Sequence, residues 1–300
     1  MSSYRGRFAP SPTGPLHFGS LIAALGSCLS ARSLGGRWLV RMEDLDRQRE
    51  QAGAADAILR TLETFGFEWD GPVMRQSERS EAYERALARL DTGGALFPCA
   101  CTRKELSDSA LVLEGERVYP GTCRAGLPPG RTARALRVRV PDEVVSFDDS
   151  IQGATAQNLL REVGDFVVRR ADGLFAYQLA VVVDDAEQGI TDVVRGADLL
   201  ASTPRQIVLQ RLLGFESPRY AHLPAAVNAS GEKLSKQTLA RPLDAARAPA
   251  LIAAALEFLG QDPPGALRRA DVREVWNWSL AHWDLGQVPR RRTLPAPAEA

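Results

Sequence analysis

The spacing of apolar and polar positions at the start of the chain predicts a strand, a loop, a helix and a second strand. Residues 4–8 have a strand pattern, and the loop at residues 9–15 contains three prolines and a glycine, which exclude regular structure there. Apolar side chains then recur at helical spacing over residues 19–34, and Gly35-Gly36 ends that helix. The second strand covers residues 38–42. This order is typical of the opening of a parallel α/β sheet.

Further along the chain, the pattern predicts more helices and an insert. Helical spacing recurs at residues 54–65, 79–90 and 203–213, and the chain after residue 241 is alanine-rich and helical, with residues 290–300 expected to be loose. Short strand patterns and a proline-glycine-rich stretch fill residues 96–168. Residues 165–183 are predicted to form a hairpin around Asp172-Gly173. We therefore expect an α/β domain in two halves with a subdomain inserted between them and a helical tail: residues 1–95, 96–170, 171–242 and 243–300.

The composition is that of a globular protein. With 45% hydrophobic residues over 300 positions, the chain can bury a sizeable core. No apolar run approaches the roughly 18 residues of a membrane span, and no apolar stretch near the N-terminus resembles a signal peptide. The formal net charge is zero, which excludes a uniformly basic surface but not a local basic groove. We expect a cytoplasmic protein without membrane contact, whose cysteines are metal ligands or buried thiols rather than disulfides.

Lysine is rare in this chain, and two of the three lysines lie close together. Apart from Lys104, Lys233 and Lys236, every basic residue among the 37 is an arginine. Lysine is a compact point charge with rotatable donors, unlike the planar fork of arginine. A pair of lysines in the run KLSKQ (residues 233–237) therefore suggests a specific anionic ligand, such as the phosphates of a nucleotide, more than ordinary surface decoration.

The loop after the first strand is a second candidate for phosphate binding. A loop that turns into a helix presents free backbone N–H groups and the positive end of the helix dipole. Gly19 allows close approach of a nucleotide to the backbone, and the His17 side chain can donate to phosphate oxygens. A lone histidine is more often structural, so His17 gains weight only in combination with the lysine pair.

Together these segments resemble the two signatures of class I aminoacyl-tRNA synthetases, His-x-Gly-His and Lys-Met-Ser-Lys-Ser. Three longer strings, RFAPSPTG (7–14), RMEDLD (41–46) and STPRQ (202–206), are similar to the glutamyl-tRNA synthetase branch of that class. Two departures are visible: Ser20 occupies the fourth position of the first signature, and the second ends in glutamine. The stretch after the lysine run is also too short for the anticodon-binding domain of a full glutamyl-tRNA synthetase.

A short-chain family within this branch, the glutamyl-queuosine tRNA(Asp) synthetases, resembles the sequence closely, including the tail string AHWDLGQVPR (281–290). The resemblance implies a Rossmann-type class I synthetase catalytic domain, an inserted zinc-bearing subdomain and a short helical C-terminal region without an anticodon-binding domain. It implies tRNA-independent activation of L-glutamate with ATP and Mg²⁺. The glutamate would then be transferred to queuosine in the anticodon of tRNA(Asp). We also expect a monomer.

The resemblance assigns roles to individual residues. His17, Lys233 and Lys236 would contact the phosphates of ATP, with Gly19 beside them. The L-glutamate pocket would consist of a carboxylate clamp, an ammonium acceptor and residues that complete it: Arg7, Ser11, Glu43, Tyr177 and Arg195. From residue types alone, Glu43 and Arg195 could form a structural ion pair, and Tyr177 could be a packed residue of the predicted hairpin.

The cysteines indicate a metal centre in the insert. Cys99, Cys101 and Cys123 offer three thiolates and leave one place open in a tetrahedral zinc site, whereas Cys28 falls in the apolar helix and is expected to be a buried thiol. The family pattern Cys-x-Cys…Tyr-x-x-x-Cys adds Tyr119 as the fourth ligand. A water molecule or a carboxylate could take that place instead, and three free cysteines in a packed subdomain are the alternative to any metal.

Several arginines crowd the insert, and they suggest either a solvated surface or a face that contacts RNA phosphates: Arg103, Arg117, Arg124, Arg131, Arg134, Arg137 and Arg139. Three rival functions remain open at this stage. The chain could be a truncated glutamyl-tRNA synthetase that charges tRNA(Glu), a ligase that transfers activated glutamate to a small amine, or an inactive nucleotide- or RNA-binding paralogue.

Overall fold

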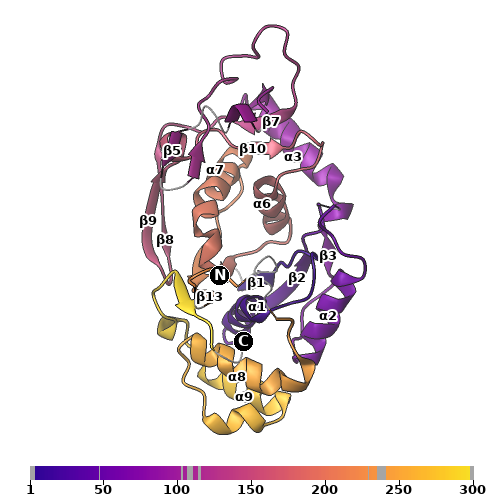
Figure 1. The fold of residues 1–300 in the computed structure, drawn as a ribbon, viewed down its shortest axis with the longest axis vertical. Coiled ribbons are helices and arrows are strands. Elements are labelled where there is room, and N and C mark those ends of the chain that lie inside the picture. The colour runs from indigo at the N-terminus through magenta and orange to yellow at the C-terminus, as the bar shows by residue number, and fades with distance from the viewer. Residues whose placement is uncertain are drawn as a thin grey trace.

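The computed structural model describes residues 4–46, 48–102, 104–106, 111–113, 116–228, 230–234 and 241–297. A parallel sheet runs through the middle of the molecule, between the inserted strands at one end of the long axis and helices α8 and α9 at the other (Figure 1). Its first strands pair in parallel in the order β1-β2-β3 (Arg5–Phe8, Arg37–Met42, Met74–Arg75). The expected parallel α/β opening is confirmed.

A second sheet of four strands lies beside the first. The backbone N–H of Thr191 donates to the carbonyl of Arg5, which brings β11 beside β1. From there the strands follow the order β11-β12-β8-β9 (Asp192–Gly196, Arg219–Leu223, Val144–Asp149, Gly153–Asn158). β11 and β12 are parallel along their length, whereas β12 meets β8 only at the pair Tyr220 and Asp149. Parallel strands from both halves thus end at the same edge.

Helices cover the sheet and divide the interior into two main apolar cores. One core joins α1, β2 and α8, and the other joins α3, α6 and α7. The α1 helix approaches the sheet closely at Gly26, where a Cβ would lie 2.6 Å from a methyl group of Leu223. The helices are α1 (Phe18–Arg32), α2 (Ala54–Thr64), α3 (Ser80–Thr92), α5 (Leu159–Glu162), α6 (Tyr177–Glu187), α7 (Thr203–Leu213), α8 (Ala248–Phe258) and α9 (Val272–His282).

Short elements complete the described chain. An antiparallel sheet in the insert has the order β10-β7-β4 (Val167–Arg169, Ala135–Val138, Leu96–Cys99), and β5 pairs with β6 (Leu111–Leu113, Glu116–Val118). Single 3₁₀ turns occupy Gln76–Glu78, Ala197–Ser202, Ala245–Arg247, Gly265–Arg269 and Leu285–Gln287. Among the described residues, no helix is both long enough and apolar enough to cross a membrane.

Two sequence-based predictions about secondary structure are corrected. In residues 165–183 only a short hairpin forms, where Arg169 bridges to Phe175, and the expected second arm is helix α6. Its apolar run is buried between α3 and α7, and periodicity cannot distinguish a fully buried helix from a fully buried strand. The tail is also more ordered than expected, because β14 (Thr293–Pro295) pairs in parallel with β13 (Ala225–Val227).

Candidate active site

A cavity of about 770 Å³ opens at the carboxyl edge of the parallel sheet. Its walls come from the ends of β1 and β11, the loop after β2, and the first turns of α1 and α6. Ligands of open parallel sheets bind at this edge. The cavity gathers nearly all the residues that the sequence predicted for glutamate and ATP: Arg7, Ser11, His17, Gly19, Glu43, Tyr177, Arg195 and Lys233. The remaining one, Lys236, lies outside the described residues.

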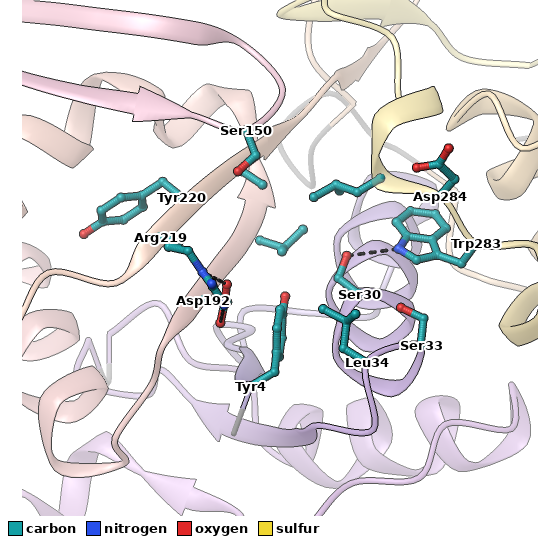
Figure 2. A pocket seen from close by; sticks show the side chains of 13 residues that line it. Tyr4, Ser30, Ser33, Leu34, Ser150, Asp192, Arg219, Tyr220, Trp283 and Asp284 are labelled. Carbon is teal, nitrogen blue, oxygen red and sulfur yellow. Dashed lines mark hydrogen bonds and ion pairs between the residues drawn. The ribbon is translucent and has the colours of Figure 1, made fainter. Parts of the chain in front are cut away.

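A smaller pocket of about 230 Å³ lies at the opposite, amino edge of the sheet (Figure 2). Its polar walls are already paired with one another. The Arg219 guanidinium donates to both carboxylate oxygens of Asp192 at 2.7 and 2.9 Å, and the Trp283 indole N–H donates to the Ser30 hydroxyl at 3.2 Å. The larger cavity, with its converging charged groups, is the better candidate for a charged substrate.

The Arg7 guanidinium at the end of β1 is held in place from behind. Its Nε donates to one oxygen of Asp185 at 3.2 Å and its Nη2 to the other at 3.4 Å. Asp185 also accepts from the Nη1 of the fully buried Arg41 at 2.8 Å. Although burial acts to raise the pKa of Asp185, the two guanidinium groups hold that pKa below its usual value. Asp185 is therefore a fixed anion between two cations.

The neighbouring Asp184 is the centre of a further buried network. One carboxylate oxygen accepts from the amide of Gln76 and the hydroxyl of Tyr83, each at 2.8 Å, and the other accepts from Nε of Arg79 at 3.0 Å. These partners come from the segment that contains α3, more than a hundred positions earlier. This network could not be predicted from the sequence, because no local spacing connects its members. It fixes α6, and with it Tyr177 at the start of that helix.

Glu43 follows β2 directly and lines the cavity. Its backbone N–H is bound to the carbonyl of Pro10, and one of its oxygens lies 3.6 Å from Nη2 of Arg41. Burial raises the pKa of Glu43 to about 7, despite the opposing charges of Arg41 and Arg7. Because the cation beside Glu43 is Arg41, the alternative of a structural ion pair between Glu43 and Arg195 is not what the structure shows. A cation bound next to Glu43 would favour the ionised form of this carboxyl group.

Arg195, at the end of β11, is anchored by neutral groups. Its Nε donates to Nε2 of His222 at 3.0 Å, and its Nη2 donates to the Thr203 hydroxyl at 2.8 Å. Its buried Nη1 has no hydrogen-bond partner among the described residues. On the same wall, burial raises the pKa of the Tyr177 hydroxyl, which therefore stays protonated. Arg7 and Arg195 therefore differ: the charge of Arg7 is matched by Asp185, whereas the partners of Arg195 are neutral.

The end of the cavity for which the sequence predicts phosphate contacts is built around the start of α1. His17 is the residue that caps this helix, and the Ser20 hydroxyl accepts from the His17 backbone N–H at 3.5 Å. Ser20, which departs from the family signature, therefore has a local structural role. At Gly19 a Cβ would lie 3.1 Å from the His17 ring, so the absent side chain makes room for that imidazole. Lys233 lines the cavity and forms an ion pair with Asp198.

The three cysteines of the insert converge as the sequence predicts. The sulfur atoms of Cys99, Cys101 and Cys123 all lie within 4.8 Å of one another, and those of Cys101 and Cys123 are 3.7 Å apart. A tetrahedral zinc ion with Zn–S bonds of about 2.3 Å separates its sulfurs by about 3.8 Å, so the donor set fits zinc. The Tyr119 hydroxyl lies 3.7 Å from the Cys99 sulfur and accepts the Cys123 backbone N–H at 2.9 Å. Cys28 is buried in α1, as expected.

The thiols of this cluster differ in their electrostatic surroundings. Burial, together with the neighbouring thiols, raises the pKa of Cys101 to about 11. Burial acts in the same direction on Cys99, but the Nε of Arg137, 3.2 Å from its sulfur, helps bring the pKa of Cys99 below its usual value. The same guanidinium lies 3.8 Å from the centre of the Tyr119 ring. Sequence reasoning did not identify Arg137 as part of the cluster.

Most of the described arginine side chains in the insert have partners within the protein. Arg137 is buried against the cysteines, Arg124 pairs with Asp165, and Arg131 pairs with Glu105. Arg139 donates to the Arg124 carbonyl and lies over Phe97. Arg137 therefore fits neither a solvated surface nor a face that contacts RNA. The side chains of Arg103 and Arg117 lie outside the described part of the chain.

Comparison with known proteins agrees with this geometry. Residues 3–248 match the family described as tRNA synthetases class I (E and Q), catalytic domain. Two curated relatives are each named Glutamyl-Q tRNA(Asp) synthetase. The one from Dechloromonas aromatica is 62% identical over 299 residues, 99% of each chain, and the one from Aromatoleum aromaticum is 60% identical over 98% of this chain and 93% of its own. A solved glutamate tRNA ligase from Elizabethkingia meningosepticum, in complex with its amino acid, has a TM-score of 0.80 at 28% identity, over 99% of this chain and 68% of that one.

Proposed function

We propose that this chain, which belongs to the family of class I tRNA synthetases (E and Q) by its catalytic domain, activates L-glutamate with ATP and transfers it to queuosine in the anticodon of tRNA(Asp). The name of the relatives that match almost the whole chain at about 60% identity points to this acceptor. The single observation that carries the proposal is the convergence, in one cavity, of Arg7, Glu43, Tyr177 and Arg195 with His17 and Lys233.

The arrangement of charges suits an amino acid with two carboxylates. The ammonium of glutamate lies against Glu43, whose carboxyl group ionises when that cation arrives. Arg7 and Arg195 bind the carboxylates, and the Tyr177 hydroxyl completes the pocket with a neutral donor. Ser11 lies on the loop beside them.

Activation needs positioning and charge stabilisation more than covalent help. An oxygen of the α-carboxylate attacks the α-phosphorus of ATP in line, and pyrophosphate leaves with its electron pair. His17, Lys233 and the start of α1 face the phosphates, and Lys236 is the second lysine of the run KLSKQ. Mg²⁺ accompanies ATP. A hydroxyl of queuosine then attacks the acyl carbon of glutamyl-adenylate, AMP leaves, the hydroxyl loses its proton, and an ester remains.

Zinc belongs to the proposal as a structural ion. Cys99, Cys101 and Cys123 would bind it as thiolates, with Tyr119 as the fourth ligand. The apolar core around these residues is small, so an ion that links β4 to the Cys123 turn stabilises the insert. All residues of the proposed site come from one chain, so a monomer suffices. ATP and tRNA meet in the cytoplasm, where we place the reaction.

The test is transfer of labelled glutamate, with ATP and Mg²⁺, to three purified RNAs: tRNA(Asp) with queuosine, tRNA(Asp) without it, and tRNA(Glu). We expect label only on the first, in an ester that mild base cleaves. Label on tRNA(Glu) would contradict the proposal and identify a short enzyme that charges the 3′ end. Label on none of them, with activation intact, would favour a small amine as the acceptor.

A further inference from the structure

His222 and Asp149 form a buried pair directly behind the cavity. Both side chains are fully buried, and Nδ1 of His222 lies 2.5 Å from one carboxylate oxygen of Asp149. The other oxygen accepts three backbone N–H groups, from Ile151, Gln152 and His222 itself, at 2.9 to 3.1 Å. Although burial acts to raise the pKa of Asp149, the backbone donors and His222 hold that pKa below its usual value, so the carboxylate is ionised.

The fixed carboxylate determines which nitrogen of His222 carries the proton. Because Asp149 can only accept, Nδ1 must be the protonated nitrogen, and in a neutral ring Nε2 then presents a lone pair. That lone pair faces Nε of Arg195 at 3.0 Å. Burial, together with the charge of Arg195, lowers the pKa of His222, which keeps the ring neutral.

The neutral ring has a consequence for Arg195. Nε and Nη2 are occupied by His222 and Thr203, while the buried Nη1 remains unpartnered among the described residues of the cavity wall. Arg7 differs, because its anchor is the anion Asp185. An anion behind Arg195 would cancel part of the charge that a substrate carboxylate needs, whereas an imidazole orients the guanidinium and leaves its charge intact.

We infer that Asp149 and His222 are positioning residues: through the Nδ1–H tautomer of His222 they hold Arg195 with Nη1 directed at a carboxylate of the amino acid. The inference rests on the proposed activation of glutamate. It adds two residues that do not touch the substrate and assigns them to affinity for the amino acid rather than for ATP.

Two substitutions at His222 separate this role from simple packing. His222→Gln retains a polar atom near the place of Nε2, and His222→Asn retains one near Nδ1 only. In glutamate-dependent exchange of pyrophosphate into ATP, we expect His222→Asn to raise the KM for glutamate at least tenfold, with the KM for ATP within twofold of wild type. We expect His222→Gln to remain within about threefold of wild type for both substrates, and Asp149→Asn to resemble His222→Asn.

Equal losses in both His222 variants, with the two KM values and kcat changing together, would overturn the inference. A wild-type protein without glutamate-dependent exchange would contradict the proposed function instead, so the two failures are distinguishable. A measurement without any variant guards against misfolding: a long-range ¹H–¹⁵N spectrum of histidine-labelled wild-type protein should show His222 as the neutral Nδ1–H tautomer. An Nε2–H tautomer would refute it.

Discussion

The active-site cavity and the cysteine cluster are both built from buried polar groups, but they differ in how charge is balanced. At the wall of the cavity, Arg7 is joined to Asp185, and Asp185 to Arg41, by contacts of 2.8 to 3.4 Å. In the cluster, the cysteine sulfurs lie within 4.8 Å of one another, and the Arg137 guanidinium is 3.2 Å from the sulfur of Cys99. The cavity supplies both signs of charge itself, whereas three thiolates need a cation from outside.

The two sites are therefore preorganised in different ways. Cations and anions of the cavity fix one another before any ligand arrives, so the substrate meets a rigid array. Bringing three thiolates together without a cation is unfavourable, so the proposed zinc ion would complete the charge balance of the cluster. The cavity should therefore be complete in the protein alone, while the insert should depend on zinc.

The largest effect is expected from a substitution in the cysteine cluster. Cys123→Ser removes one of three thiolates, and we expect loss of the proposed zinc and a fall of about 4 kcal/mol in the free energy of unfolding, because loss of a metal is among the changes that destabilise proteins most. Metal analysis and denaturant unfolding measure the two effects. Cys28→Ala, in α1, is the matched control and should retain zinc. Equal zinc content in both variants would show that the cluster is not the metal site.

The next largest effect is expected from a substitution in the cavity. Glu43→Gln leaves an amide where the ammonium needs an anion, and we expect kcat/KM for glutamate in pyrophosphate exchange to fall about 100-fold. Zinc content should not change, since the two sites are separate. Glu63→Gln, an exposed change on α2, serves as the control. A Glu43→Gln variant with normal kinetics would remove Glu43 from the glutamate pocket.

A smaller effect follows from the pKa of Glu43, which burial raises to about 7 in the free cavity. Only the ionised carboxylate attracts an ammonium group, so glutamate affinity is present above pH 7 and is lost as the pH falls below it. We expect glutamate to bind about tenfold more weakly at pH 6 than at pH 8. Calorimetric titration without ATP measures this. In Glu43→Gln, the affinity for glutamate should depend little on pH. Equal affinity at pH 6 and pH 8 in the wild-type protein would contradict this role of Glu43.

The smallest effect concerns the surface of the insert. Arg131 and Glu105 form an exposed ion pair near the cluster, and exposed pairs contribute little to stability. We expect Arg131→Ala to leave the melting temperature and zinc content unchanged. Arg137→Met removes the buried guanidinium between Cys99 and Tyr119 and should lower the melting temperature clearly. A clearly lower melting temperature for Arg131→Ala would show that this surface ion pair, rather than a metal ion, stabilises the insert.

The sequence identified those parts of the two sites that depend on local spacing or on a motif. The cysteine cluster followed from the spacing of Cys99, Cys101 and Cys123, and the loop before α1 followed from its position after a strand. The supports behind the cavity could not be predicted, because they join distant segments: His222 is 73 positions from Asp149, and Tyr83 is 101 from Asp184. Only three histidines occur in the chain, and the place of His222 near a strand end was a signal that the sequence analysis did not use.

The same limit explains the missed helix. Residues 180–183 of α6 are rich in β-branched side chains, which favour strands, but packing between α3 and α7 decides their conformation. Patterns inside a fully buried run contain no polar face that could indicate the period. Tertiary contacts that the sequence does not display therefore overrode local preference there.

The most direct test of the comparison is pyrophosphate exchange with L-glutamate in the complete absence of tRNA, repeated with tRNA(Asp) added. We expect exchange without RNA, at a rate within about twofold of the rate with RNA, because the protein completes the cavity by itself. Exchange that appears only when tRNA is present would contradict it, because the array of Arg7, Glu43 and Arg195 would then have to be assembled by the RNA.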